Sequence, residues 1–246
     1  FESRSPGIRL QIDAVDDVAP AFIVRIAAGT PPDVVRLRGT EPAEFGVQGM
    51  ILDLTDLIRR DMAAEFRTFF PAAVPSLGWA GRTYSIPFGV TVQSILYNQT
   101  RFAEHGLDTP GAHWSWERDV IQAGKKVTRD LDGDGNMDIF FLSPLGVLEW
   151  FPWVTAGDGR MFSEDGLQFL GDSPAGHDAL QFEGDLIHVH KIMPSIEERA
   201  DDAFAFAKGT SVYCLEGSWF IGTMRRLGIS WEWDAAEVPT FKGMQA

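Results

Sequence analysis

The densest group of metal-ligating side chains in the sequence lies between residues 130 and 138. Oxygen atoms recur there with the spacing of an EF-hand calcium loop, which takes its ligands at alternate positions and has glycine at position 6. Phe141 stands at position 12, where an EF-hand has a bidentate Glu. Two interpretations follow, a weak calcium site and an acidic turn that needs no metal. The candidate ligands are Asp130, Asp132, Asp134, Asn136 (through its backbone carbonyl) and Asp138.

A second group of polar side chains follows a short predicted strand at residues 33–37. Ligands bind at the carboxyl ends of strands in open α/β sheets, and this group lies at such an end. Guanidinium groups can hold a ligand through two parallel hydrogen bonds, so the group could fix the hydroxyls of a solute. The two arginines also leave open an acidic or phosphorylated sugar. The residues are Arg36, Arg38, Thr40 and Glu41.

A third group combines an indole with polar side chains. Trp219 opens a predicted helix directly after Glu216 and a Gly-Ser turn, so its ring stands beside unpaired helix amides. A sugar presents apolar C–H faces ringed by hydroxyls, and these suit an indole with polar neighbours. Thr91 and Gln93 lie on a predicted strand and are further contact candidates. Most of the 8 Trp and 18 Phe must belong to the core, but a minority can face a ligand.

Alternating strands and helices must position these groups. Strands at 8–12 and 33–37 flank a helix with an apolar stripe, and this order predicts a parallel β-α-β unit. Residues 84–98 form a β-rich run that is too long for a typical single strand. We predict that this run crosses between two α/β lobes, residues 1–90 and 91–246, with a hinge near residues 89–93.

The second half of the chain continues in the same α/β pattern without an internal repeat. Its short β segments are bounded by turn residues, and Ser173-Pro174 and Gly217-Ser218 have the character of helix starts. Strands are predicted at 139–142, 210–215 and 229–233, and helices at 100–105, 115–127, 147–154, 174–189, 199–208 and 219–226.

Composition limits the possible partners. The formal net charge of −14 argues against nucleic acid, because phosphate binding needs clustered Lys and Arg. No apolar run approaches the ~20 residues that span a bilayer. Cys214 is the single cysteine and lies in an apolar run, which predicts a buried thiol and no internal disulfide. The chain begins without Met, which favours a processed or trimmed start.

Enzyme motifs are missing from the sequence. It contains no GxSxG, Walker loop, GxGxxG or HExxH pattern. His188 and His190 are two positions apart on a predicted helix, where their rings point away from each other. Scattered Asp and Glu single out no glycosidase pair.

Several segments, taken in order along the whole chain, resemble the extracellular solute-binding proteins of ABC importers, specifically the sugar-binding family that includes maltose-binding protein. Each motif is weak by itself, and their order makes the resemblance specific. The segments are FESRSPGIRL at 1–10, AAGTPPDVV at 27–35, YSIPF with LYNQ within 84–99, WE at 116–117, FAKG to EGSW at 206–219, and VPTFKG at 238–243.

The resemblance implies a two-lobed, periplasmic-binding-protein-like (type II) α/β fold and a noncatalytic function. A saccharide would bind in the cleft between the lobes and be enclosed by hinge closure, with no required cofactor. Trp219 would stack on a sugar ring, and Glu149 and Trp150 would offer polar and aromatic contacts from the second lobe. The partners would be ABC permease transmembrane subunits, the protein would be a monomer, and it would be periplasmic or extracellular, with or without a lipid anchor.

Compared with that family, the chain lacks an initial strand and helix and the segments that return to complete the first lobe. We therefore expect the fold to be incomplete at both ends. Maltose itself is not the expected ligand, because Leu37, Thr40 and Glu41 stand where the maltose-binding relatives have an aromatic and an acidic-basic pair. Two alternatives from other classes stay open: a secreted carbohydrate-active enzyme and a calcium-dependent binding module.

Overall fold

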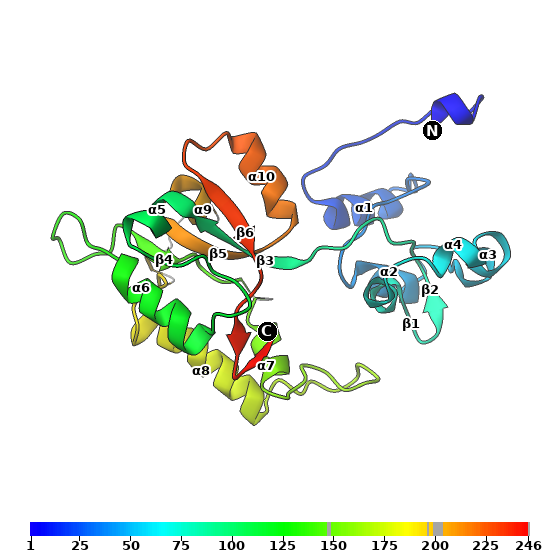
Figure 1. Cartoon of the computed structure of the whole chain (residues 1–246). Helices are drawn as coiled ribbons and strands as arrows, with labels where there is room; N and C mark the ends of the chain where they lie inside the picture. Colours follow the sequence, from blue (N-terminus) through cyan, green and yellow to red (C-terminus); the bar gives the residue numbers. More distant parts are fainter. Residues whose placement is uncertain (147–148, 196, 199–203, 246) are drawn as a thin grey trace. The chain divides into compact units, whose positions relative to one another are not determined.

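The computed structural model describes residues 1–146, 149–195, 197–198 and 204–245. The chain divides into two compact units, Phe1–Val90 and Thr91–Ala246 (Figure 1). The predicted hinge region, residues 89–93, contains the boundary between them.

The first unit is mainly helical, with a small core. Phe22 of α1 packs on Phe45 of α2 with 5.4 Å between ring centroids. The hairpin of β1 and β2 turns at Ala80 and Gly81, both at positive φ, as a two-residue hairpin loop requires. The elements are α1 (Val18–Ala27), α2 (Glu41–Val47), α3 (Thr55–Asp61), α4 (Ala63–Phe66), β1 (Gly78–Trp79) and β2 (Arg82–Thr83), with 3₁₀ turns at Glu2–Arg4, Pro71–Ala73 and Pro75–Leu77.

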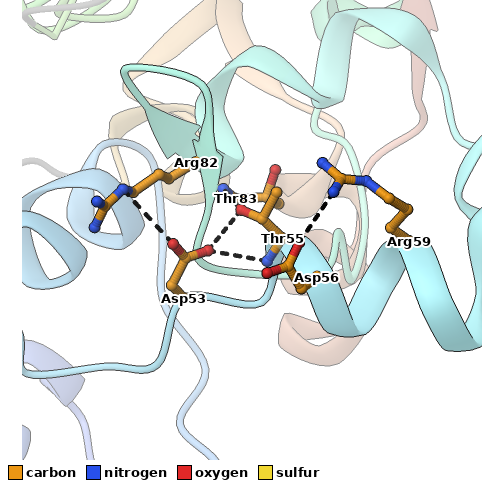
Figure 2. A network of polar contacts seen from close by, with 6 residues as sticks. All are labelled: Asp53, Thr55, Asp56, Arg59, Arg82 and Thr83. Carbon is orange, nitrogen blue, oxygen red and sulfur yellow. Dashed lines mark hydrogen bonds and ion pairs between the residues drawn. The ribbon is translucent and has the colours of Figure 1, made fainter.

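A polar network joins the start of α3 to the hairpin (Figure 2). The Asp53 carboxylate accepts hydrogen bonds from the amide and hydroxyl of Thr55, at 2.9 and 2.5 Å. These bonds, together with the nearby Arg82 guanidinium 3.7 Å away, lower the pKa of Asp53. The Thr55 hydroxyl in turn accepts a bond from the amide of Thr83 in β2 at 2.9 Å. The network therefore satisfies the first amide of α3 and joins the hairpin to the helix through a single threonine.

The predicted β-α-β unit at the start of the chain is wrong. Its helix is confirmed as α1, but residues 8–12 and 33–37 belong to none of the described strands. A strand exists only where a neighbour accepts its backbone hydrogen bonds. Residues 8–12 are exposed, and the Leu10 amide donates to the Glu2 carboxylate at 2.7 Å rather than to a neighbouring strand. Residues 8–12 therefore have the alternating apolar pattern of a strand, but they lack the backbone pairing with a neighbour that defines a strand.

The second unit is built on a four-stranded sheet in the order β4-β5-β3-β6. β5 runs parallel to β4 and antiparallel to β3, and β3 runs antiparallel to β6. The carboxyl ends of β4, β5 and β6 and the amino end of β3 therefore share one edge. The strands are β3 (Gln93–Asn98), β4 (Phe140–Leu142), β5 (Ser211–Gly217) and β6 (Trp233–Ala236), and a separate hairpin pairs β7 (Thr240–Phe241) with β8 (Met244–Gln245).

The predicted strands of this unit are largely confirmed. β4 and β5 occupy the predicted segments, whereas β6 begins only where the predicted segment 229–233 ends. Of the run 84–98, residues 93–98 form β3 and pair on both sides, while residues 84–92 belong to no strand. The long run is therefore a short strand preceded by extended chain.

Helices pack on both faces of this sheet. Asn98 and Ser173 cap α5 and α8 with hydrogen bonds of 2.9 and 3.2 Å. The start at Ser173 is the predicted one, whereas α5 begins one residue before the predicted helix 100–105. Residues 147–148 of the predicted helix 147–154 and residues 199–203 of the predicted helix 199–208 lie outside the described residues. The helices are α5 (Gln99–Glu104), a π-helical turn (Trp116–Val120) that leads into α6 (Ile121–Val127), α7 (Phe151–Ala156), α8 (Pro174–His188), α9 (Ala205–Lys208) and α10 (Trp219–Leu227).

Alternation along β5 divides the core into two clusters. Tyr213 and Leu215 face the larger cluster, whose aromatic side chains include Trp116, Trp153 and Phe141. Cys214 faces the smaller one, beneath α9 and α10. Burial raises the pKa of the Cys214 thiol far above its usual range, so the thiol is an inert core group, as the sequence predicts.

Candidate functional site

The second unit brings several predicted contact residues together at the sheet edge where β5 ends and β3 begins. Gln93 pairs with Gly217, and Ser94 pairs with Glu216. The Ser218 amide donates to the carbonyl of Val92 at 2.8 Å, which holds the start of α10 against the residues that lead into β3. Because the carboxyl end of a strand is where α/β sheets bind ligands, we call this edge the strand-end site. It comprises Thr91, Gln93, Glu216, Gly217 and Trp219, and the charge of Glu149 acts on Glu216.

Gly217 allows two of these side chains to approach closely. A Cβ atom at this position would lie 2.6 Å from Cδ1 of Trp219 and 2.5 Å from Cγ2 of Thr91. The indole of Trp219 is 55% exposed and meets the ring of Phe220 edge-on at 5.3 Å. The ring is thus supported from behind by a core residue and presents a large part of its surface to solvent, which is the arrangement that stacking on a ligand needs.

Two carboxylates give the strand-end site its charge. The half-buried Glu216 accepts a hydrogen bond from the amide of Gly217 at 3.2 Å. Burial raises the pKa of Glu216, and the negative charge of Glu149 raises it further. The buried hydroxyl of Ser94, opposite Glu216, has no hydrogen-bond partner among the residues that the structure describes. Sequence reasoning missed Ser94, although its register with Glu216 follows once the two strands are paired.

Trp150 lies partly buried just before α7. It directly precedes α7, contacts Phe151 edge-on at 4.8 Å and packs, partly buried, against the larger core cluster. Its neighbour Glu149 is close enough to raise the pKa of both Glu216 and Cys214. Trp150 therefore packs partly into the core at the start of α7, whereas Trp219 is 55% exposed.

The candidates of the first unit lie close together around the start of α2. The Glu41 carboxylate accepts from the amide of Arg38 at 2.6 Å, and Thr40 is exposed at the residue before the helix. The guanidinium of Arg38 lies 3.9 Å from Asp17. Arg36 stands over the ring of Phe88 at 5.0 Å. Phe88 is 85% exposed, and its place beside Arg36 could not be inferred from the sequence, where 51 residues separate the two.

The acidic loop brings three of its five predicted ligands together. Carboxylate oxygens of Asp130, Asp132 and Asp138 lie within 4.8 Å of one another, and two of these residues are exposed. The amides of Gly133 and Gly135 donate to Asp130 at 2.7 and 2.9 Å. This group of three carboxylates could hold a cation, and its carboxylates also close the turn by themselves.

The remaining two predicted ligands of the loop bond to each other. Asp134 accepts from both the amide and the side chain of Asn136, at 2.7 and 3.0 Å, and these bonds lower the pKa of Asp134. Phe141, at position 12, is fully buried in β4 and supplies no ligand. The loop therefore has the turn geometry of an EF-hand with an incomplete set of ligands.

Residues 1–213 match the family of bacterial extracellular solute-binding proteins. The chain belongs to this family. Its members are binding proteins without catalytic activity, so the alternative of a carbohydrate-active enzyme is wrong. In the described part of the chain, no helix has the length and hydrophobicity that crossing a membrane demands.

Two curated relatives are similar over part of their length. The diacetylchitobiose-binding protein NgcE of Streptomyces coelicolor is 27% identical over 129 residues, which is 50% of this chain and 27% of the relative. The multiple sugar-binding protein of Streptococcus mutans is 25% identical over 117 residues, 45% of this chain and 25% of the relative. The matches thus span about a quarter of each of these relatives.

Solved structures confirm the predicted fold class. The ABC substrate-binding protein Lmo0181 of Listeria monocytogenes, in complex with cycloalternan, is similar with a TM-score of 0.83 at 23% identity, over 98% of this chain and 61% of that one. The maltose/maltodextrin-binding domain MalE of Bdellovibrio bacteriovorus, bound to maltotriose, is similar with a TM-score of 0.77 at 23% identity, over 100% of this chain and 62% of that one. The fold is the α/β fold of periplasmic binding proteins, and the chain spans about three-fifths of those structures.

Proposed function

We propose that this solute-binding protein is the extracytoplasmic component of an ABC importer and that it binds a saccharide at the strand-end site. The exposed indole of Trp219, held over Gly217 and next to Glu216, carries the proposal. An indole face covers the C–H face of a sugar ring, while carboxylates and amides at its border accept and donate hydrogen bonds. A mismatched solute would leave these polar groups unpaired, which makes the site selective.

The relatives support a saccharide as the solute class. One relative is named for diacetylchitobiose and another for multiple sugars, and solved structures of similar fold hold cycloalternan and maltotriose. The proposed contacts from the second unit are Thr91, Gln93, Glu149, Trp150, Glu216 and Trp219, and those from the first unit are Arg36, Arg38, Thr40 and Glu41.

Closure of the two units about residues 89–93 is the proposed mechanism. The division of the chain at Val90, next to Gly89 and outside any strand, supports a hinge there. Ligand shifts the population toward a closed form only if it binds that form better than the open one. Hinge closure around a ligand is known for periplasmic binding proteins in general. The proposed partners are the permease subunits, and the proposed location is periplasmic or extracellular, with the protein as a monomer, free or lipid-anchored.

A saccharide ligand should raise the thermal stability of the purified protein. At a concentration 100 times its dissociation constant, a ligand stabilises the folded state by about 2.7 kcal/mol, which corresponds to a rise in Tm of roughly 5–10 °C for a chain of this size. A thermal-shift screen of mono- and oligosaccharides, with amino acids and short peptides as the comparison set, measures this. Stabilisation by a peptide or amino acid and by no saccharide would reject the proposed solute class.

For the acidic loop we propose weak calcium binding, at Asp130, Asp132 and Asp138. The convergence of three carboxylates favours it, and the lack of a ligand at position 12 predicts a dissociation constant of about 1 mM, as in weak extracellular sites. Calcium at about 5 mM should raise Tm by roughly 2 °C, and magnesium should not. Asp130→Asn should abolish the rise, whereas Asp165→Asn, in another exposed turn, should keep it. No rise in Tm with calcium and no heat of binding in calorimetry would leave the loop as a metal-free turn, and an equal rise with both cations would reject a calcium-selective site.

A further inference from the structure

Ser218 extends the pairing of β3 with β5 by one position. The pair Gln93–Gly217 is followed in the same register by Val92 and Ser218. The amide of Ser218 donates to the carbonyl of Val92 at 2.8 Å, and the amide of Val92 donates to the hydroxyl of Ser218 at 3.4 Å. An antiparallel pair of this kind normally exchanges two backbone bonds, so here a side-chain oxygen accepts in place of a carbonyl.

The backbone of Ser218 explains this replacement. Its φ of −54° and ψ of −17° are helical, so its carbonyl points along α10, toward the amide four residues later. A serine at the N-cap position usually accepts from an amide in the first turn of its helix. The Ser218 hydroxyl caps none of the described amides of α10 and accepts from Val92 instead. One residue therefore holds both backbone groups of Val92, which is 64% exposed and directly precedes β3.

The next residues of the two segments meet over Gly217. A Cβ atom there would lie 2.5 Å from Cγ2 of Thr91, and 2.6 and 2.7 Å from Cδ1 and Nε1 of Trp219. The Thr91 methyl group and the pyrrole edge of the indole thus share a small space that only a glycine leaves open. Because groups packed this closely move together, the position of residues 91–92 sets the position of the indole.

We propose that Ser218 is a positioning residue that couples the indole of Trp219 to residues 91–92 of the proposed hinge region. A ligand shifts a conformational equilibrium only through interactions that differ between the two states. A ligand stacked on Trp219 needs a firm link to the hinge to have that effect, and the two bonds between Ser218 and Val92 supply it. The inference rests on the proposed function and adds how the occupied site acts on the hinge.

Coupling of this kind is reciprocal, so a bound saccharide should stabilise the bond from Val92 to Ser218. Hydrogen exchange of the Val92 amide, resolved by NMR, measures the opening of that bond. The probe is whichever of diacetylchitobiose, maltotriose and cellotriose raises Tm most. At saturation it should slow the exchange of Val92 at least about fivefold in the wild type and should have no such effect in Ser218→Ala.

A measurement without any saccharide tests the positioning itself. In protein labelled with 5-fluorotryptophan, the fluorine resonance of Trp219 is the one that disappears in Trp219→Phe. This resonance should shift or broaden in Ser218→Ala, because the indole has lost one of the bonds that tie its helix to Val92. It should return to its wild-type position in Ser218→Thr, which keeps the hydroxyl.

Affinity for the same saccharide gives a third readout. Ser218→Ala should weaken binding about threefold to tenfold, as expected for one hydrogen bond that orders a binding residue, and Ser218→Thr should stay within about twofold of the wild type. Ser163→Ala is the matched control, since the Ser163 hydroxyl also accepts from a backbone amide, that of Gln168 at 2.9 Å, in a turn outside the site. The control should alter neither the Trp219 resonance nor the affinity.

The possible outcomes separate the inference from the function on which it rests. A lower Tm in Ser218→Ala, with the Trp219 resonance and the affinity unchanged, would make Ser218 a residue of structure alone and would overturn the inference. Slowed exchange of Val92 that persists in Ser218→Ala would mean that the ligand covers this amide directly, and would overturn it too. A shifted Trp219 resonance in Ser218→Ala, with no saccharide bound by the folded wild type, would support the link to the indole and overturn the proposed function.

Discussion

Replacing Trp219 by alanine should weaken saccharide binding at least about 30-fold while the protein stays folded. The indole is 55% exposed, so its loss removes little core, but it removes the stacking surface of the strand-end site. An aromatic anchor at a binding site contributes about 2 kcal/mol or more, which corresponds to that change in affinity. Isothermal titration calorimetry with the strongest ligand of the thermal-shift screen measures the effect, and circular dichroism verifies the fold.

Trp79→Ala is a matched control for this substitution. Trp79 is the same residue type, is 41% exposed and lies in the hairpin of the first unit. The Trp79→Ala variant should bind the ligand with the affinity of the wild type. If Trp219→Ala bound as tightly as the wild type, or if both variants lost affinity equally, stacking on Trp219 would be rejected.

The largest loss of stability should come from Tyr213→Ala. The ring of Tyr213 is fully buried, stacks on Phe141 with centroids 4.9 Å apart, and lies within 6.3 Å of Trp114, Trp116 and Phe102. Truncation of a large buried aromatic side chain costs about 3–5 kcal/mol, a large fraction of the stability of an ordinary domain. Urea denaturation followed by fluorescence should show a correspondingly lower midpoint at an unchanged slope.

Tyr213→Phe separates packing from polarity at the same position. The Tyr213 hydroxyl is buried and has no hydrogen-bond partner among the described residues, and burial raises its pKa well above the usual value. Removing an unpaired buried hydroxyl should leave stability unchanged or raise it by about 1 kcal/mol. A loss of stability comparable to that of Tyr213→Ala would show that the hydroxyl, and not the ring, holds this part of the core.

Local sequence signals predicted the second unit well because its elements carry their own start and stop residues. Ser173 caps α8 where the pattern expects a helix start, and the apolar run before Gly217 becomes β5. The predicted contact residues Gln93, Glu216 and Trp219 come together at one edge because they lie at or next to the ends of two strands that pair with each other.

The features that the sequence did not predict depend on contacts between residues far apart in the chain, and local patterns carry no information about such contacts. Residues 8–12 have the alternation of a strand, yet pairing decides whether a strand forms, and the described part of the first unit provides no partner. The placement of Arg36 over the ring of Phe88 likewise joins segments that are far apart in the sequence. In the acidic loop, the spacing predicted five ligands, while competing hydrogen bonds turn Asp134 and Asn136 toward each other.

The position of β3 in the middle of its sheet has a consequence for the order of folding. Both of its partner strands come much later in the chain, and the residues that meet at its amino end, Val92 and Ser218, are 126 positions apart. Loop closure over such a distance is slow, so β3 must wait as an unpaired apolar segment until β5 and β6 have been synthesised. During that interval the nascent chain exposes an unpaired strand edge, which is the kind of surface through which folding chains aggregate.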